Sequence, residues 1–163
     1  GKSARLRGSL HVEGKPYRCK MKQIRLKIKS IQRDPEGDEL DINIACDGTM
    51  EMRGGRIYIK YEEDISGEGD IVENTMSFDI GERDVISLSR IGDAKMSCVF
   101  ERGKRYPCNY ELPFGAFELV VSAKCVDNSV DYEKGGEVYL KYAMESRGIV
   151  IQNVKYRLTV EKA

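Results

Sequence analysis

The sequence has few of the residues on which catalytic and membrane proteins depend. It contains no tryptophan, four prolines and a single histidine, His11, among 163 residues. The chain beyond residue 20 therefore has no imidazole for a Ser-His or Cys-His nucleophile pair, or for a histidine-based metal site. No uncharged apolar stretch approaches the roughly 20 residues of a membrane-spanning helix. These absences exclude most hydrolase mechanisms, and they predict no membrane helix.

Metal and nucleotide motifs are also missing. The five cysteines stand at positions 19, 46, 98, 108 and 125, and they form neither a C-x-x-C pair nor a zinc-binding spacing. There is no G-x-x-x-x-G-K-[ST] loop and no G-x-G-x-x-G turn leading into a helix. We therefore expect no metal, no cofactor and no enzymatic activity. The odd number of cysteines is typical of reduced thiols in a cytoplasmic protein.

The formal net charge of zero conceals a basic N-terminus. Residues 1–20 hold six basic residues and one acidic residue, whereas residues 21–163 hold 21 basic and 26 acidic residues. The basic leader lacks apolar periodicity, so it is either a disordered arm that touches nucleic acid or membrane, or a non-native stretch before Met21. Residues 21–163 form one mildly acidic domain without a basic stripe. For this domain, neither nucleic acid nor a membrane is an expected partner.

Beyond residue 21, apolar residues recur at every second position. Ile24, Leu26 and Ile28 alternate with three cations, which puts the aliphatic side chains on one face of a strand. The same pattern returns near residues 40–46, 50–52, 57–61, 76–80, 86–88, 96–100, 106–112, 117–125, 138–144 and 154–160. Turn signals such as Asp47-Gly48 separate these segments. No apolar pattern of helical period is long enough for a major helix.

The pattern of about ten short strands predicts an all-β protein. Short connections favour antiparallel neighbours, and one apolar face on each strand needs a partner face to bury it. Closure into a barrel removes the exposed edges at which sheets aggregate. We therefore expect an antiparallel up-and-down barrel. A sandwich of two sheets is the alternative that alternation by itself leaves open.

Three runs of sequence carry a resemblance to a known family. Ser89–Met96, Phe114–Leu119 and Asp131–Val138, the last followed by Tyr142, resemble the YwiB-like bacterial family, domain of unknown function 1934. The resemblance extends from Met21 to the C-terminus. It implies a calycin-like β-barrel, similar in outline to lipocalins and fatty-acid-binding proteins, in a Firmicute-type cytoplasm. It implies no activity, because the family has no established functional residues.

The inner face of the predicted barrel carries five tyrosines: Tyr61, Tyr106, Tyr110, Tyr142 and Tyr156. Buried hydroxyls need partners, so they either bond one another and water or line a pocket that orients a ligand. A ten-stranded barrel is wider than the eight-stranded kind that side chains just fill, so a lumen of at least about 300 Å³ would suit a ligand. The first hypothesis is binding of a small, partly apolar molecule. The alternative is a non-enzymatic interaction or regulatory module with a barrel filled by side chains.

Two further features permit competing interpretations. Cys98 and Cys108 are equidistant from Gly103, so a hairpin there sets them opposite each other on the inner face. This permits a disulfide, but we expect two reduced core thiols in a reducing compartment.

The acidic residues of segment 34–41 lack the order of oxygen donors found in an EF-hand, and they predict a solvated turn. The longer acidic loop, 62–73, is either ordinary surface or a lid over one mouth of the barrel.

Overall fold

Ten β-strands account for most of residues 20–161, the part of the chain that the computed structural model describes. They are β1 (Lys20–Arg33), β2 (Glu39–Arg53), β3 (Arg56–Asp64), β4 (Ile71–Asp79), β5 (Glu82–Gly92), β6 (Lys95–Glu101), β7 (Arg105–Leu112), β8 (Gly115–Asn128), β9 (Gly136–Ser146) and β10 (Ile149–Glu161). The basic leader lies outside the described residues, except that β1 begins at Lys20. Residues 20–161 include no helix of the length and apolar character needed to cross a bilayer.

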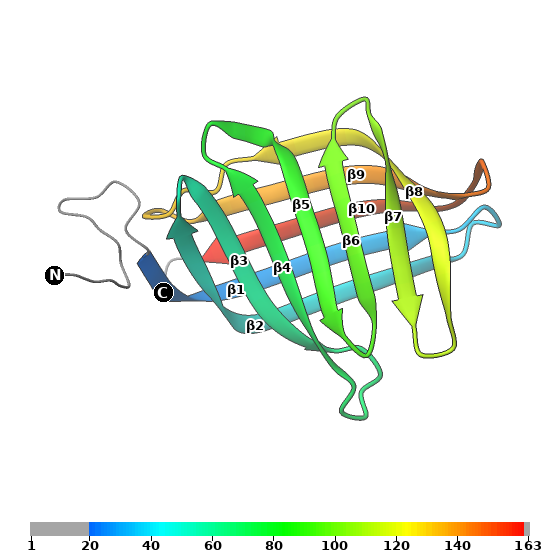
Figure 1. Cartoon of the computed structure of the whole chain (residues 1–163), viewed down its shortest axis with the longest axis horizontal. Helices are drawn as coiled ribbons and strands as arrows, with labels where there is room; N and C mark the ends of the chain where they lie inside the picture. The colour runs from blue at the N-terminus through cyan, green and yellow to red at the C-terminus, as the bar shows by residue number, and fades with distance from the viewer. Residues whose placement is uncertain (1–19, 162–163) are drawn as a thin grey trace, which may run out of the picture.

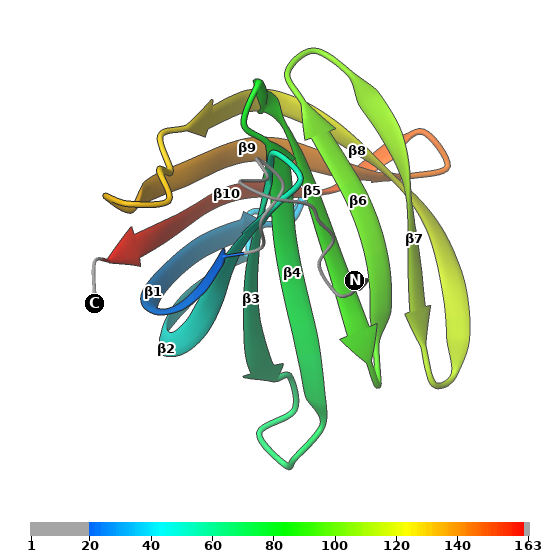
Figure 2. The same cartoon turned by 60° about the vertical axis from the view of Figure 1, so that its left-hand side comes forward.

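The strands close into a barrel in which each strand pairs with its neighbours along the chain. Every pairing is antiparallel, and β10 returns to pair with β1. The predicted up-and-down barrel is therefore confirmed, and the two-sheet sandwich is excluded. Seen from the side, β3–β7 cross in front of the remaining five strands of the closed sheet (Figure 1), and a turned view shows the same crossing (Figure 2).

The turns alternate between the two ends of the barrel. Those after β1, β3, β5, β7 and β9 lie at one end, toward the lower right of Figure 1, which we call the odd-turn end. Those after β2, β4, β6 and β8 lie at the opposite, even-turn end. The inner face of every strand therefore contributes to two halves of the interior, one near each end.

Apolar side chains fill the even-turn half of the interior. Strands from all sides of the barrel contribute to this core, which we call the packed half. Its largest side chains are no more than 1% exposed: Leu26, Met50, Ile57, Ile59, Phe78, Ile86, Phe100, Leu140 and Leu158. Fully burying an aliphatic or aromatic side chain stabilises a fold by roughly 1.5–3 kcal/mol. This half is the hydrophobic core that holds the barrel together.

One predicted turn lies in the middle of a strand. β2 continues through Asp47-Gly48, so the prediction of a turn there is wrong. A Cβ atom at Gly48 would lie 2.5 Å from the carbonyl oxygen of Lys60 and 2.9 Å from Cδ1 of Leu26. Glycine is needed at this position because β2 bends (Figure 1) and its neighbours approach closely. The two segments predicted on either side of the glycine are one strand.

Two side chains that were predicted to face inward do not. Ile80 is 38% exposed because β4 ends at Asp79 and Ile80 lies in the turn that leads to β5. The pairing of β8 with β9 slips just before Cys125, and Val126 is buried in its place. The predictions that Ile80 and Cys125 face inward are therefore wrong. In β8 the cause is a bulge, which adds one residue to the strand and moves the later side chains to the other face.

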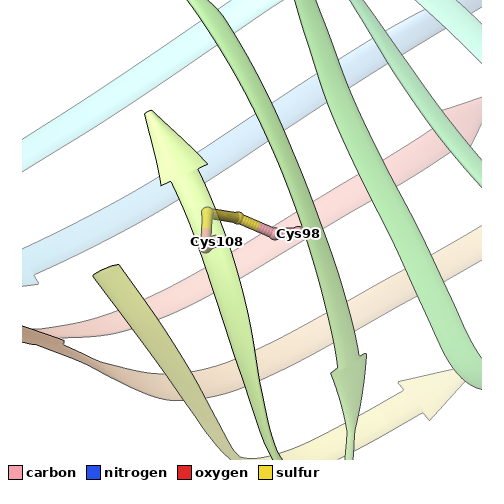
Figure 3. Close-up of a disulfide and its surroundings, with 2 residues drawn as sticks. All are labelled: Cys98 and Cys108. Carbon is pink, nitrogen blue, oxygen red and sulfur yellow. A yellow bond between two sulfur atoms is a disulfide. The ribbon is translucent and has the colours of Figure 1, made fainter. Parts of the chain in front are cut away.

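A disulfide joins Cys98 of β6 to Cys108 of β7, with the two Cα atoms 4.8 Å apart (Figure 3). The predicted juxtaposition is confirmed, but the expectation of two reduced thiols is wrong. The ladder between these strands extends over only three residue pairs, and Pro107, next to Cys108, has no N–H with which to continue it. The disulfide fastens β6 to β7 where their backbone pairing ends.

Candidate ligand cavity

A cavity of about 250 Å³ lies inside the barrel, in the odd-turn half. It is slightly smaller than the lumen expected from the sequence. Its wall contains aliphatic and methionine side chains from several strands, such as Ile28, Ile44, Leu88, Met96 and Met144. Between them lie polar side chains: Ser30, Gln32, Tyr61, Glu63, Asn74, Arg90, Tyr110, Tyr142, Gln152 and Tyr156. The cavity therefore offers both apolar contact and hydrogen-bonding groups.

Four of the five predicted tyrosines line this cavity. Tyr61, Tyr110, Tyr142 and Tyr156 come from β3, β7, β9 and β10. Tyr106 lies farther toward the even-turn end, and its hydroxyl donates a hydrogen bond of 2.8 Å to the Glu101 carboxylate. That hydrogen bond raises the pKa of Tyr106. Tyr106 therefore has the predicted phase along β7 but does not line the cavity.

Two of the cavity tyrosines meet across the barrel. The hydroxyl oxygens of Tyr61 and Tyr156 are 3.3 Å apart. Both residues are buried, with exposed fractions of 6% and 8%. Burial raises the pKa of Tyr61 to about 12 and raises that of Tyr156 as well. Both hydroxyls therefore remain protonated at neutral pH. Because one hydroxyl donates to the other, the second keeps a hydrogen to offer to a ligand.

Tyr142 stands at the boundary between the cavity and the packed half. Its ring lies 4.7 Å from that of Phe100, centre to centre, in a tilted arrangement. Burial raises the pKa of Tyr142 above its usual value. Among residues 20–161 its hydroxyl has no hydrogen-bond partner. The hydroxyl of Ser30, on a residue 5% exposed, is likewise without a partner in the described chain. Both groups line the cavity.

A charged cluster also lines the cavity. Nη2 of Arg90 lies 3.1 Å from Oε1 of Glu63, and Nε of Arg90 donates to Oδ1 of Asn74 at 2.9 Å. The Asn74 amide nitrogen donates to the same Glu63 oxygen at 3.1 Å. Nη1 of Arg90 donates to the Tyr110 hydroxyl at 3.5 Å. Three strands thus hold one positive and one negative charge in a fixed, mutually neutralising arrangement.

The sequence contained a signal for this cluster. Glu63 continues the inward series Ile57, Ile59 and Tyr61, and it is the penultimate residue of β3. Asn74 and Arg90 likewise occupy inward positions of β4 and β5. The predicted strands begin and end at apolar residues, which places Glu63 in the predicted acidic loop. Extending the period of two by one step beyond these residues identifies all three: Glu63 after Tyr61, Asn74 before Met76 and Arg90 after Leu88.

Solvent and apolar side chains meet at the odd-turn end. The side chains of Arg90 and Glu63 are 19% and 23% exposed, so water reaches the cluster from this end. Leu40 and Phe117 occupy inward positions near the ends of their strands, yet they are 56% and 47% exposed. Phe114, on the turn between β7 and β8, is 80% exposed. Exposed apolar side chains at this end therefore lie close to a cavity wall that carries polar groups.

In the acidic turns at this end, aspartate carboxylates accept hydrogen bonds from backbone N–H groups of the same turn. Asp34 accepts a hydrogen bond of 2.9 Å from the backbone N–H of Asp38, which confirms the predicted solvated turn. Asp64 accepts backbone N–H groups of Gly69 and Gly67 at 3.0 and 2.8 Å, and these bonds lower the pKa of Asp64. No group of three or more His, Cys, Asp or Glu residues in the described chain has the geometry to hold a metal ion.

Known proteins share both the sequence pattern and the fold. The family model "Domain of unknown function (DUF1934)" matches residues 26–158. The uncharacterized beta-barrel protein YwiB of Bacillus subtilis (strain 168) is 30% identical over 112 residues, which cover 69% of this chain and 75% of that protein. The crystal structure of the ywiB protein from Bacillus subtilis is similar, with a TM-score of 0.76 and 22% identity over 88% of this chain and 93% of that chain. This chain belongs to the DUF1934 family.

Proposed function

We propose that this protein is a cytoplasmic, calycin-like binding protein that holds a small, partly apolar molecule in the odd-turn half of its barrel. The observation that carries the proposal is the cavity lined by four tyrosines, in which hydroxyls of Tyr142 and Ser30 find no partner in the described chain. Buried polar groups without partners are costly. A ligand that accepts hydrogen bonds would remove that cost.

The contrast with the packed half supports the proposal. Small barrels usually fill their interiors with side chains, and this one does so in its even-turn half. The odd-turn half keeps polar groups and open volume instead. A purely structural interior would gain stability from apolar residues at these positions. A few polar groups placed among apolar side chains in a cavity are typical of ligand sites.

We propose binding rather than catalysis for this cavity. Burial raises the pKa of Tyr61, Tyr142 and Tyr156, which keeps them protonated, and Arg90 and Glu63 neutralise each other. No nucleophile of the cavity wall is hydrogen-bonded to a general base, because Ser30 has no partner in the described chain. The lining groups therefore support recognition of a ligand and not turnover.

Native mass spectrometry of the purified protein tests this function. A bound molecule is expected to add mass to the wild type, and solvent extraction followed by untargeted mass spectrometry would identify it. The variant Ile44→Phe fills the cavity and is expected to lose the added mass. The matched variant Ile31→Phe adds the same ring on an outward position, 38% exposed, and is expected to keep it. A wild type without added mass, or equal occupancy in both variants, would overturn the proposal.

The second candidate function is an interaction or regulatory module. Three of the most exposed apolar side chains, Ile91, Phe114 and Ile149, lie at the odd-turn end and are 62%, 80% and 68% exposed. Exposed apolar patches mark protein contacts as well as ligand entrances. A variant with all three replaced by Ser separates the two functions. A ligand-binding protein keeps its bound mass in this variant, whereas an interaction module loses its partner.

A further inference from the structure

Several hydroxyl groups of the cavity hold a hydrogen that no group of the described chain accepts. The Tyr61 and Tyr156 hydroxyls share one bond, so one of their hydrogens is uncommitted. The Tyr110 hydroxyl accepts from Arg90 and keeps its own hydrogen. The hydroxyls of Tyr142 and Ser30 have no partner among the described residues and retain theirs. These hydroxyls can also accept hydrogen bonds, but a lone pair without a partner is tolerated more readily than a hydrogen without an acceptor. A ligand therefore gains most here by accepting the free hydroxyl hydrogens.

The charges of the cavity are already balanced. Arg90 is held by Glu63 and by the Asn74 amide oxygen, and the Asn74 nitrogen is bonded to Glu63. An anion placed beside this cluster would leave one negative charge without a counterion. A cation placed there would leave one positive charge without a counterion. Either excess charge is penalised in a partly desolvated interior.

We infer that the ligand is an uncharged molecule that presents carbonyl-type acceptor oxygens to the tyrosine hydroxyls and an apolar body to the rest of the wall. This inference rests on the proposed function and specifies its ligand class. The cavity of about 250 Å³ also limits the size of the ligand. It is below the roughly 300–1,000 Å³ of typical ligand pockets, and its volume matches about eight water molecules. Probes with eight carbons are therefore suitable.

Three probes that differ only in their polar group test the inference: 2-octanone, octanoate and octylammonium. Their dissociation constants are measured by titration calorimetry at neutral pH on the full-length wild-type protein. The ketone is expected to bind at least about tenfold more tightly than either ion, which corresponds to about 1.4 kcal/mol. The reason is that each ion adds an unbalanced charge beside the neutral Arg90–Glu63 pair.

Two variants change the charge balance of the cavity in opposite directions. Glu63→Gln leaves Arg90 without its counterion, so octanoate is expected to gain about tenfold in affinity. Arg90→Gln leaves Glu63 unpaired, so octylammonium is expected to gain by a similar factor. Glu62→Gln is the matched control, because it removes the same charge from an exposed, outward position. It is expected to leave the ranking of the three probes unchanged. Circular dichroism checks that each variant folds. If one of the two charge variants does not fold, the other is enough to test the inference.

The outcomes separate the inference from the proposed function. If octanoate binds the wild type best, the inference is overturned, but binding in the barrel stands. The same holds if the molecule carried through purification is charged, or if Glu62→Gln changes the ranking as Glu63→Gln does. If no probe binds and the purified protein carries no ligand, the proposed function is overturned together with the inference.

Discussion

The two halves of the barrel interior are built from the same ten strands but have different contents. In the even-turn half, Met50, Ile59, Phe78 and Phe100 are no more than 1% exposed, and apolar contacts fill the space. In the odd-turn half, the inward positions of the same strands carry Glu63, Asn74, Arg90 and tyrosine hydroxyls around a cavity. The halves also differ in backbone pairing, because β2 and β3 pair only over residues 49–53 and 56–60, toward the even-turn end. Side-chain chemistry and this local opening together distinguish the two halves.

This division separates stability from recognition. Apolar burial in the packed half stabilises a closed barrel whose backbone groups are paired in ladders. Apart from the β2–β3 ladder, the ladders extend into the odd-turn half, which therefore tolerates polar groups that lower stability. Polar groups on rigid strands keep a defined geometry for a ligand. The predictions below test whether the two halves differ in this way.

The largest expected effect is the truncation of a side chain in the packed half. Phe100→Ala is expected to lower the free energy of unfolding by about 3–5 kcal/mol, because it removes a fully buried ring and leaves a void. Met144→Ala, in the partly open cavity wall, is expected to cost less than about 1.5 kcal/mol. Urea unfolding followed by circular dichroism measures both. Equal costs would contradict the difference in packing between the halves.

Loss of the disulfide is expected to cost roughly 3 kcal/mol, as a link between residues ten positions apart restricts the unfolded chain. Reductant is therefore expected to lower the melting temperature of the wild type. The double variant Cys98→Ala/Cys108→Ala serves as the control, and its melting temperature should not respond to reductant. Alkylation of the unreduced, unfolded chain is expected to label three of the five cysteines. Labelling of all five would show that the bond does not form.

The sequence was sufficient to predict the barrel, because a period of two with short turns has few other solutions. It also identified Tyr61, Tyr110, Tyr142 and Tyr156 as inward residues. It could not separate Tyr106 from them, since alternation gives the face of a side chain and not its height along the barrel axis.

The errors have particular physical causes. Asp47-Gly48 has the composition of a turn, but Gly48 is required by the close approach of the Lys60 backbone, a long-range contact that local sequence does not reveal. The bulge in β8 carries no residue type that distinguishes it from regular strand. The sequence prediction does not include the Glu63–Arg90 pair, because it ends each strand at its outermost apolar residue.

An intermediate effect is expected from the amide that links the charged cluster. Asn74 is 1% exposed, and both ends of its side chain are hydrogen-bonded to charged groups. Asn74→Ala is expected to cost about 1–3 kcal/mol of unfolding free energy, because Arg90 and Glu63 each lose a partner in the interior. Asn109→Ala removes the same amide from the exposed face of β7 and is expected to change stability by less than about 0.5 kcal/mol. Similar values for the two variants would show that the cluster is too solvated to need its amide.

The smallest expected effect is on the pH dependence of stability at alkaline pH, through the buried Tyr61 of the odd-turn half. Burial raises the pKa of Tyr61 to about 12, against about 10 in an unfolded chain. Between these pH values the unfolded chain loses a proton that the folded chain keeps, so stability decreases as pH rises. The contribution of one such tyrosine is about 1.4 kcal/mol per pH unit. Tyr61→Phe is expected to reduce the slope by about this amount, measured from urea midpoints across this range. Tyrosinate absorbance should show Tyr61 ionising only as the protein unfolds. An unchanged slope, or ionisation of Tyr61 in the folded protein near pH 10, would mean that the odd-turn half is open to water at the depth of the tyrosine pair.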